Sequence, residues 1–167
     1  EDTMVALCSA PGRTEICGNH TDHQHGRVLA AAVNLDFLAC VALNGTSVVH
    51  FQSEGWPMTS VDLADLEVKE EEKETTASLI RGVLAKLHKA GYPVAGFDMY
   101  VTSTVLPGSG LSSSAACEVL IGTTGNHLFC QDKFDAVEIA KIGQAAENEY
   151  FGKPCGLMDQ TASSVGD

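Results

Sequence analysis

Residues 107–116 read PGSGLSSSAA and join two segments of different periodicity. Before them, the apolar residues Phe97, Met99 and Val101 alternate with polar ones, which predicts a strand. After them, a Ser/Ala-rich start predicts a helix that runs to about Phe129. Glycines let a backbone approach a ligand, and a helix N-terminus offers unpaired N–H groups and a positive dipole end. The stretch therefore indicates a phosphate site, although a glycine-rich loop with a serine cap explains its composition equally well.

The first half of the chain favours strands. A mostly apolar stretch, Met4–Ser9, predicts a strand that ends at the turn signal Pro11-Gly12. The odd positions over Val33–Leu43 are all apolar, which predicts a second strand. Asn44-Gly45 then predicts a hairpin turn into a third strand, Thr46–Phe51.

The second half favours helices. Residues 52–74 are polar and acidic, and we interpret them as a solvated loop or helix start. From Thr75 the apolar residues recur at helical spacing, which predicts a helix that Gly91 ends. The residues on its apolar face are Leu79, Ile80, Val83, Leu84 and Leu87. A further helix is expected from about Phe134 to Tyr150, ended by Gly152 and Pro154. Strands followed by helices indicate an α+β domain.

Composition and charge narrow the possible partners. The chain has 167 residues, 44% of them hydrophobic and 19% charged, which fits one folded domain. Its net charge of −12 disfavours binding to a nucleic acid but leaves nucleotides open. No apolar run is long enough to cross a membrane, and the opening EDTMVALCSAPGR does not read as a signal peptide. Six cysteines without a C-x-x-C pair indicate a reducing, cytoplasmic setting.

A second polar stretch, GRTEICGNHTDH, spans residues 12–23. Its glycine-punctuated donors and acceptors are suited to a polyol. His20, Asp22, His23 and His25 also suggest a metal site. Zinc ligands usually come from separated segments, so we favour the polyol interpretation.

The third stretch, CGLMDQ, spans residues 155–160. Its aspartate, Asp159, follows a glycine and two apolar residues, which would position it as a proton acceptor. A helix cap or a surface charge is the simpler interpretation of a lone aspartate.

Taken in chain order, the three stretches resemble the signature segments of the galactokinase family, within the GHMP kinase superfamily. The family patterns are G-R-x-N-L-I-G-E-H-x-D-Y, P-x-G-x-G-L-S-S-S-A and C-G-x-M-D-Q. The third matches at every fixed position, and the second matches from Gly108 onward with one residue fewer after Pro107. The first match is looser, because Asn19 stands where the family has glutamate and Glu15, Cys17 and His23 also depart. These departures bear on which sugar is bound.

The resemblance implies a fold and a domain organisation. It implies the GHMP-kinase N-terminal domain, a mixed β-sheet with helices packed on it, of the type called ribosomal protein S5 domain 2-like. Residues 1–167 would form this domain, with a C-terminal domain lying beyond Asp167. Because the family's active site forms between domains, little kinase activity is expected of these 167 residues alone.

The resemblance also implies residue roles. Asp159 would accept the proton of the sugar hydroxyl, and Arg13 would stabilise charge during phosphoryl transfer. Mg2+ would be held by Ser114 and Glu147. The ATP-binding residues would be Gly108, Ser109, Gly110, Leu111, Ser112, Ser113 and Ser114. The sugar-binding residues would be Asn19, His20, Thr21, Asp22 and Gly156.

The implied reaction converts D-galactose and ATP to galactose 1-phosphate and ADP, the first step of galactose catabolism, by a monomer. Three alternatives stay open: a kinase for N-acetylgalactosamine or arabinose, a sensor that binds galactose and ATP without transfer, and a metal-binding or structural domain. The uninterrupted segment Ser112–Ala116, together with Arg13 and Asp159, favours the enzyme over the sensor.

Overall fold

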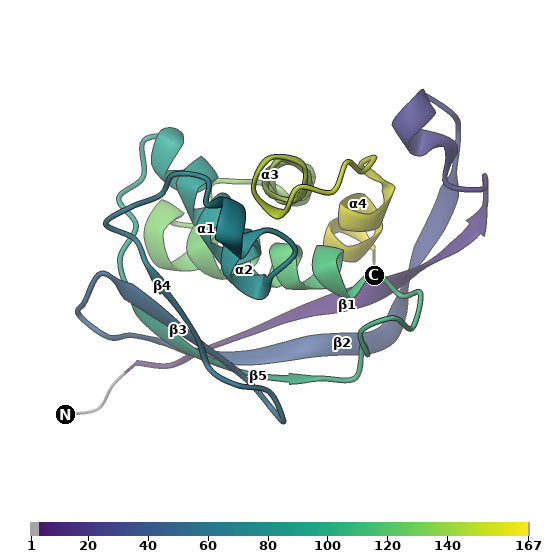
Figure 1. Ribbon diagram of the computed structural model, residues 1–167. Helices are drawn as coiled ribbons and strands as arrows, with labels where there is room; N and C mark the ends of the chain where they lie inside the picture. The colour runs from purple at the N-terminus through teal and green to yellow at the C-terminus, as the bar shows by residue number, and fades with distance from the viewer. Residues whose placement is uncertain (1–3, 167) are drawn as a thin grey trace.

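A computed structural model describes residues 4–166, in which one mixed sheet carries four α-helices on a single face (Figure 1). The strands are β1 (Ala6–Cys17), β2 (Leu29–Leu43), β3 (Val48–Ser53), β4 (Thr59–Asp62) and β5 (Phe97–Ser103). The α-helices are α1 (Thr76–Lys89), α2 (Ser113–Cys130), α3 (Ala136–Ala146) and α4 (Met158–Val165). Short turns of 3-10 helix, η1 (Thr21–Gln24) and η2 (Glu70–Glu72), and a π-helical turn, η3 (Glu147–Phe151), complete the order. The predicted α+β class with helices packed on a mixed sheet is confirmed.

The strand order is β1-β2-β5-β3-β4, with β3 and β5 parallel and the other neighbours antiparallel. The predicted hairpin at Asn44-Gly45 is therefore wrong, because β5 lies between the two strands that this turn connects. Asn44, which follows β2, connects the ends of β3 and β5. Its Nδ2 donates to the Val48 carbonyl at 2.9 Å and to Asp98 Oδ1 at 2.8 Å. A turn motif in the sequence predicts where the chain bends, but it does not predict which strands pair with each other.

Strand β1 does not stop at Pro11-Gly12, which corrects the predicted turn. It continues to Cys17, with a shift of register against β2 between Pro11 and Arg13. A proline lacks the N–H of a ladder hydrogen bond, and β1 is an edge strand, where this loss is tolerated. The continuation carries Arg13 to the end of the sheet at which the loop before α2 lies.

The acidic stretch 52–74 is more ordered than predicted. It contains β4 and η2, and Glu72 is paired with the buried Arg81 of α1. This pairing links residues nine positions apart across a turn, which local composition does not reveal.

The core lies between the sheet and the helices. The predicted apolar face of α1 is confirmed, since Leu79, Ile80, Val83, Leu84 and Leu87 are all buried. Helix α2 is buried along most of its length and packs between α1, α3 and β1. The last predicted helix is divided: α3 starts at a capping box of Asp135 and Glu138, and η3 follows it. Helix α4 was not predicted.

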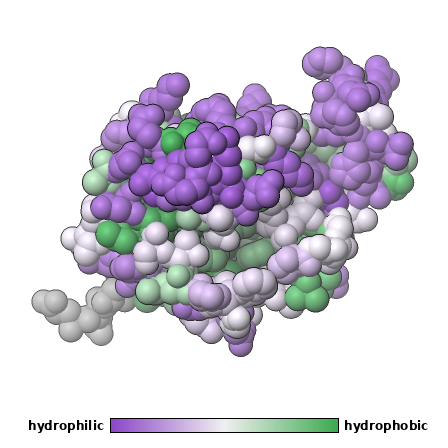
Figure 2. All heavy atoms as spheres, in the orientation of Figure 1, coloured by the Kyte–Doolittle hydropathy of each residue, from purple (hydrophilic) through white to green (hydrophobic). Residues whose placement is uncertain are grey.

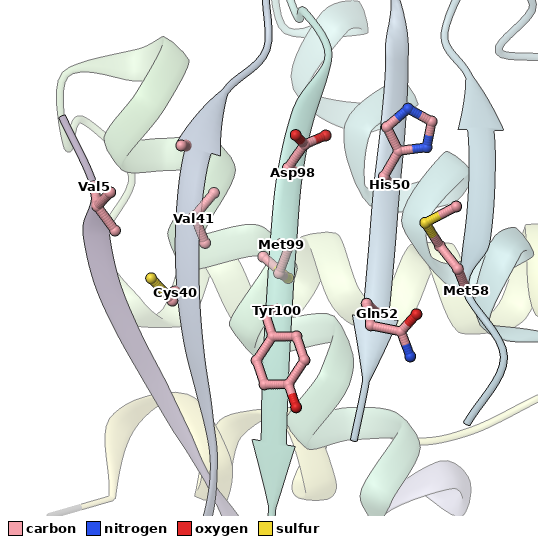
Figure 3. A pocket seen from close by; sticks show the side chains of 10 residues that line it. Val5, Cys40, Val41, His50, Gln52, Met58, Asp98, Met99 and Tyr100 are labelled. Atoms are coloured by element: carbon pink, nitrogen blue, oxygen red, sulfur yellow. The ribbon is translucent and has the colours of Figure 1, made fainter. Parts of the chain in front are cut away.

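Within the described residues 4–166, the opposite face of the sheet carries no helix. Its exposed side chains include Leu7, Leu38 and Tyr100. Figure 3 shows Tyr100 of β5 beside Gln52 of β3, in a pocket whose lining extends across the sheet from Val5 to Met58. In the space-filling view the helical side is mostly hydrophilic, whereas apolar residues lie toward the sheet (Figure 2). Among residues 4–166, no helix combines the length and apolar character that a membrane span requires.

Candidate active site

Arg13 joins the three sequence motifs at one place. Its side chain, only 8% exposed, donates from Nε to Asp159 Oδ1 at 2.7 Å and from Nη2 to Asp159 Oδ2 at 3.0 Å. Its Nη1 donates to the carbonyl of Gly110 at 2.8 Å, and its backbone N–H donates to the carbonyl of Leu111. A forked guanidinium suits such two-point contact with a carboxylate. Arg13 and Asp159 are 146 residues apart, so the fold alone brings them together.

Asp159 lies in the first turn of α4 and has a third donor, the hydroxyl of Ser112, at 2.5 Å. Burial opposes ionisation of Asp159, but the hydrogen bonds from Arg13 and Ser112 outweigh it and lower the pKa of this carboxyl. The side chain stays 26% exposed, toward the cleft. Asp159 is thus a charged acceptor that a small ligand can reach.

The loop before α2 has the backbone that its glycines predict. Gly108 and Gly110 have φ angles of 74° and 79°, and the space beside each is open. Ser109 turns back through its N–H to the carbonyl of Leu106. Ser112 precedes the helix with a φ of 56° and makes no side-chain cap, since its hydroxyl is used by Asp159. The serine-cap interpretation is therefore wrong for Ser112.

The N-terminal turn of α2 has N–H groups without intrahelical partners, as every helix does. Ser113 and Ser114 occupy this turn. Because backbone N–H groups and the helix dipole favour anions, this turn and the loop together suit a phosphate chain.

Ser114 and Glu147 bring two hard oxygen atoms together. The Ser114 hydroxyl donates to Glu147 Oε1 at 3.0 Å, although α2 and η3 are far apart in sequence. Glu147 is almost fully buried and Ser114 partly so. Mg2+ takes one or two protein oxygens together with water and substrate phosphates. The donor set therefore fits this ion.

Asp22 and Gly156 are packed against each other. Asp22 Oδ2 accepts a hydrogen bond from the backbone N–H of Met158 at 3.0 Å. A Cβ on Gly156 would lie 1.9 Å from the same oxygen, so any larger residue displaces the carboxylate. This contact joins the loop at residues 12–23 to the start of α4.

Of the other predicted sugar-binding residues, one lines the polar cleft beside Asp159 and two do not. His20 lines the cleft, and its backbone N–H donates to Glu15 Oε1 at 2.8 Å. Asn19 is exposed and Thr21 donates within its own turn to the carbonyl of Gly18; neither lines the cleft. In the range 4–166, no group of three or more His, Cys, Asp or Glu side chains is arranged to hold a metal ion.

Two cavities meet at the start of α2. The first is a polar cleft of about 370 Å³ that holds Arg13, Asp22 and Asp159. The second measures about 570 Å³ and is largely apolar. Its lining includes Phe37, Phe51, Trp56, Pro107, Leu79, Ser113 and Phe151. Ser114 lines both, so a ligand could extend from one cavity to the other past this hydroxyl.

Sequence reasoning missed several residues at these cavities. Lys153 lines the polar cleft, and Trp56 and Phe151 line the apolar cavity. Gln160 and Glu118 are buried behind the cleft. Gln160 lies within the third motif, which was the only signal for it; the other four come from segments whose sequence shows no pattern tied to this site.

Comparison with known proteins agrees with this arrangement. The family described as GHMP kinases N terminal domain matches residues 78–167, and the galactokinase galactose-binding signature matches residues 1–43. A galactokinase of Clostridium tetani is 37% identical over 94% of this chain and 40% of its own length. A galactokinase of Bacillus subtilis is 33% identical over 94% of this chain and 40% of its length. The chain thus spans about two fifths of the length of these curated relatives.

Solved structures give the same fold. The crystal structure of Lactococcus lactis galactokinase complexed with galactose superposes with a TM-score of 0.89 at 30% identity. The alignment covers 98% of this chain and 42% of that one. A heptose 1-phosphate kinase, with a TM-score of 0.78 at 21% identity, shares the fold. The resemblance seen in the three motifs is confirmed: the chain belongs to the GHMP kinase family and carries the galactokinase galactose-binding signature.

Proposed function

We propose that this chain is the N-terminal domain of a galactokinase, which transfers the γ-phosphoryl group of ATP to O1 of D-galactose. The observation that carries the proposal is the meeting of two cavities at Ser114, beside an aspartate that Arg13 holds. Both the matched signature and the galactose named for the Lactococcus structure support this sugar. A second domain, corresponding to the rest of the relatives' length, would complete the site.

The polar cleft is the proposed sugar site. Asp22, His20 and the backbone at Gly156 would bind the sugar hydroxyls, with O1 directed at Asp159. The anomeric hydroxyl would give its proton to Asp159 as O1 bonds to the γ-phosphorus. The bond from that phosphorus to the bridging oxygen breaks, and ADP leaves. Arg13 contacts Asp159 and the glycine loop and would stabilise the charge that moves between them.

The apolar cavity is the proposed site of the adenine base. Trp56 and Phe151 offer flat apolar surfaces there, and Ser113 and Ser114 connect it to the glycine loop Gly108–Ser112. The triphosphate would run along this loop over the N-terminus of α2. Mg2+ at Ser114 and Glu147 would neutralise part of the phosphate charge.

The test is galactose-dependent ADP release by the full-length protein, with and without Asp159→Asn. Loss of the proton acceptor should lower kcat by roughly a hundredfold or more, with little change in galactose binding. The matched control is Asp132→Asn, at an exposed position remote from the cleft, which should keep wild-type turnover.

Two outcomes would contradict the proposal. Binding of ATP and galactose without turnover in the wild-type protein would favour a sensor. Faster turnover of N-acetylgalactosamine or arabinose than of galactose would assign another sugar.

A further inference from the structure

Three polar side chains are buried directly behind the cleft. Glu118 comes from α2, Glu147 from η3 and Gln160 from α4, and their residues are 0%, 2% and 0% exposed. Gly143 of α3 closes the cluster, since a Cβ there would lie 3.2 Å from Glu118 and 3.3 Å from Gln160. Two carboxyl groups and one amide are thus shut off from solvent.

The amide of Gln160 bridges the two carboxyl groups. Its Nε2 donates to Glu118 Oε2 at 2.9 Å and to Glu147 Oε2 at 2.7 Å, which uses both amide hydrogens. Two buried oxygens in this cluster have no hydrogen-bond partner among the described residues: Oε1 of Glu118 and Oε1 of Gln160. Both belong to the pair that already shares a hydrogen bond.

A proton on Glu118 would pair these two oxygens with each other. A neutral carboxylic acid has one O–H donor, and the amide oxygen of Gln160 is a free acceptor. If the O–H of Glu118 donates to this amide oxygen, the acid and the amide form a reciprocal pair with no unpaired oxygen. Burial raises the pKa of Glu118 well above its ordinary value, which agrees with the neutral form.

The pair has a consequence for Glu147. Its Oε2 is held by Gln160, so its Oε1 stays directed at the Ser114 hydroxyl, 3.0 Å away. We propose that neutral Glu118 and Gln160 form an acid–amide pair that positions Glu147 as a ligand for Mg2+. This inference rests on the proposed kinase function and assigns both members as positioning residues, since neither lines the cleft.

Two substitutions of Glu118 separate this role from simple packing. Glu118→Gln keeps an acceptor for Gln160 Nε2 and replaces the acid O–H by an amide N–H. Glu118→Met has similar length and removes both hydrogen bonds. In the full-length protein, the apparent KM for Mg2+ should stay within about twofold for Glu118→Gln and rise about tenfold or more for Glu118→Met. The KM for galactose should change little in either, and Glu71→Met, at an exposed position, is the matched control.

A second readout does not depend on activity. The infrared spectrum of the full-length protein at neutral pH should contain the carbonyl stretch of a protonated carboxylic acid, and this band should disappear in Glu118→Gln. Loss of kinase activity in every protein, wild type included, would overturn the proposed function while the band still tests the pair. No difference in the band between wild type and Glu118→Gln would overturn the neutral acid.

Other results would overturn the positioning role. One is an apparent KM for Mg2+ that is unchanged in Glu118→Met. The other is an apparent KM for Mg2+ that rises in Glu118→Gln as much as in Glu118→Met. If Glu118→Met does not fold, Glu118→Gln and the infrared band decide the matter.

Discussion

Asp159, the proposed proton acceptor, is held by contacts from two other segments of the chain. Its two oxygens receive three side-chain hydrogen bonds, two from Arg13 and one from Ser112. These bonds hold it ionised and fix its direction toward the cleft. An ionised carboxylate with a low pKa takes a proton only when the donor becomes acidic, which in the proposed reaction happens as O1 of the sugar attacks phosphorus. The low pKa therefore suits a base that acts late in the reaction.

Gly156→Ala should weaken galactose binding. The added Cβ would lie 1.9 Å from Asp22 Oδ2, so Asp22 must leave its hydrogen bond to Met158. We expect the KM for galactose to rise about tenfold or more, as for a lost buried polar contact, with the KM for ATP nearly unchanged. Steady-state kinetics of the full-length protein measure both constants.

Gly122→Ala in α2 is the control for this substitution, since its added Cβ meets apolar side chains alone, Ile139 at 3.0 Å and Val83 at 3.9 Å. It should alter stability and leave both KM values unchanged. Equal effects of Gly156→Ala on both substrates would refute the local displacement of Asp22.

At the scale of elements, Arg81 of α1 binds the acidic segment 62–72 that precedes this helix. Its Nε and Nη2 donate to the two oxygens of Glu72 at 2.7 Å each, and its Nη1 donates to the carbonyls of Asp62 and Asp65. Arg81 is 2% exposed, so removing one partner leaves a buried charge unpaired. This segment is followed by residues 74–76, which line the apolar cavity. Arg81 thereby links the stability of α1 to the proposed base site.

Glu72→Gln should make the protein less stable in a way that depends on pH. The hydrogen bond from Arg81 lowers the pKa of Glu72 in the folded state. A lowered pKa contributes stability above the unfolded value of about 4.3, and this contribution is lost as pH falls through the folded value. The difference in free energy of unfolding between wild type and Glu72→Gln should therefore be largest near neutral pH and shrink below about pH 4.3.

Urea denaturation at several pH values gives this difference. Glu71→Gln, at the exposed neighbouring position, should show almost none. A difference for Glu72→Gln that stays constant across this range would mean that the ion pair with Arg81 does not set the pKa.

For the molecule as a whole, the two cavities lie at its surface. Trp56 is 61% exposed although it lines the apolar cavity, and the loop at Gly108 and Gly110 has open space beside it. Phosphoryl transfer depends on excluding water and on holding both substrates in line. In residues 4–166 both proposed sites are open to solvent at these positions.

The 167 residues alone should therefore show little or no turnover. A coupled ADP-release assay with ATP, Mg2+ and galactose compares them with the full-length protein under the same conditions. Circular dichroism confirms beforehand that the isolated chain is folded. Turnover by the isolated chain close to that of the full-length protein would refute the need for a second domain.

The sequence by itself determined the family, because the three motifs occur in the family's order. It also determined α1 and β5, because their apolar residues recur at helical and strand spacing. Those periods arise from backbone geometry within a few residues. The tertiary structure decided what lies far apart: β5 between β2 and β3, Arg13 against Asp159, and Gln160 between Glu118 and Glu147. The positions of Asn19 and Thr21 outside the cleft belong to this second group. These arrangements depend on how whole elements pack, because strand pairing and the burial of polar groups are settled by contacts across the core.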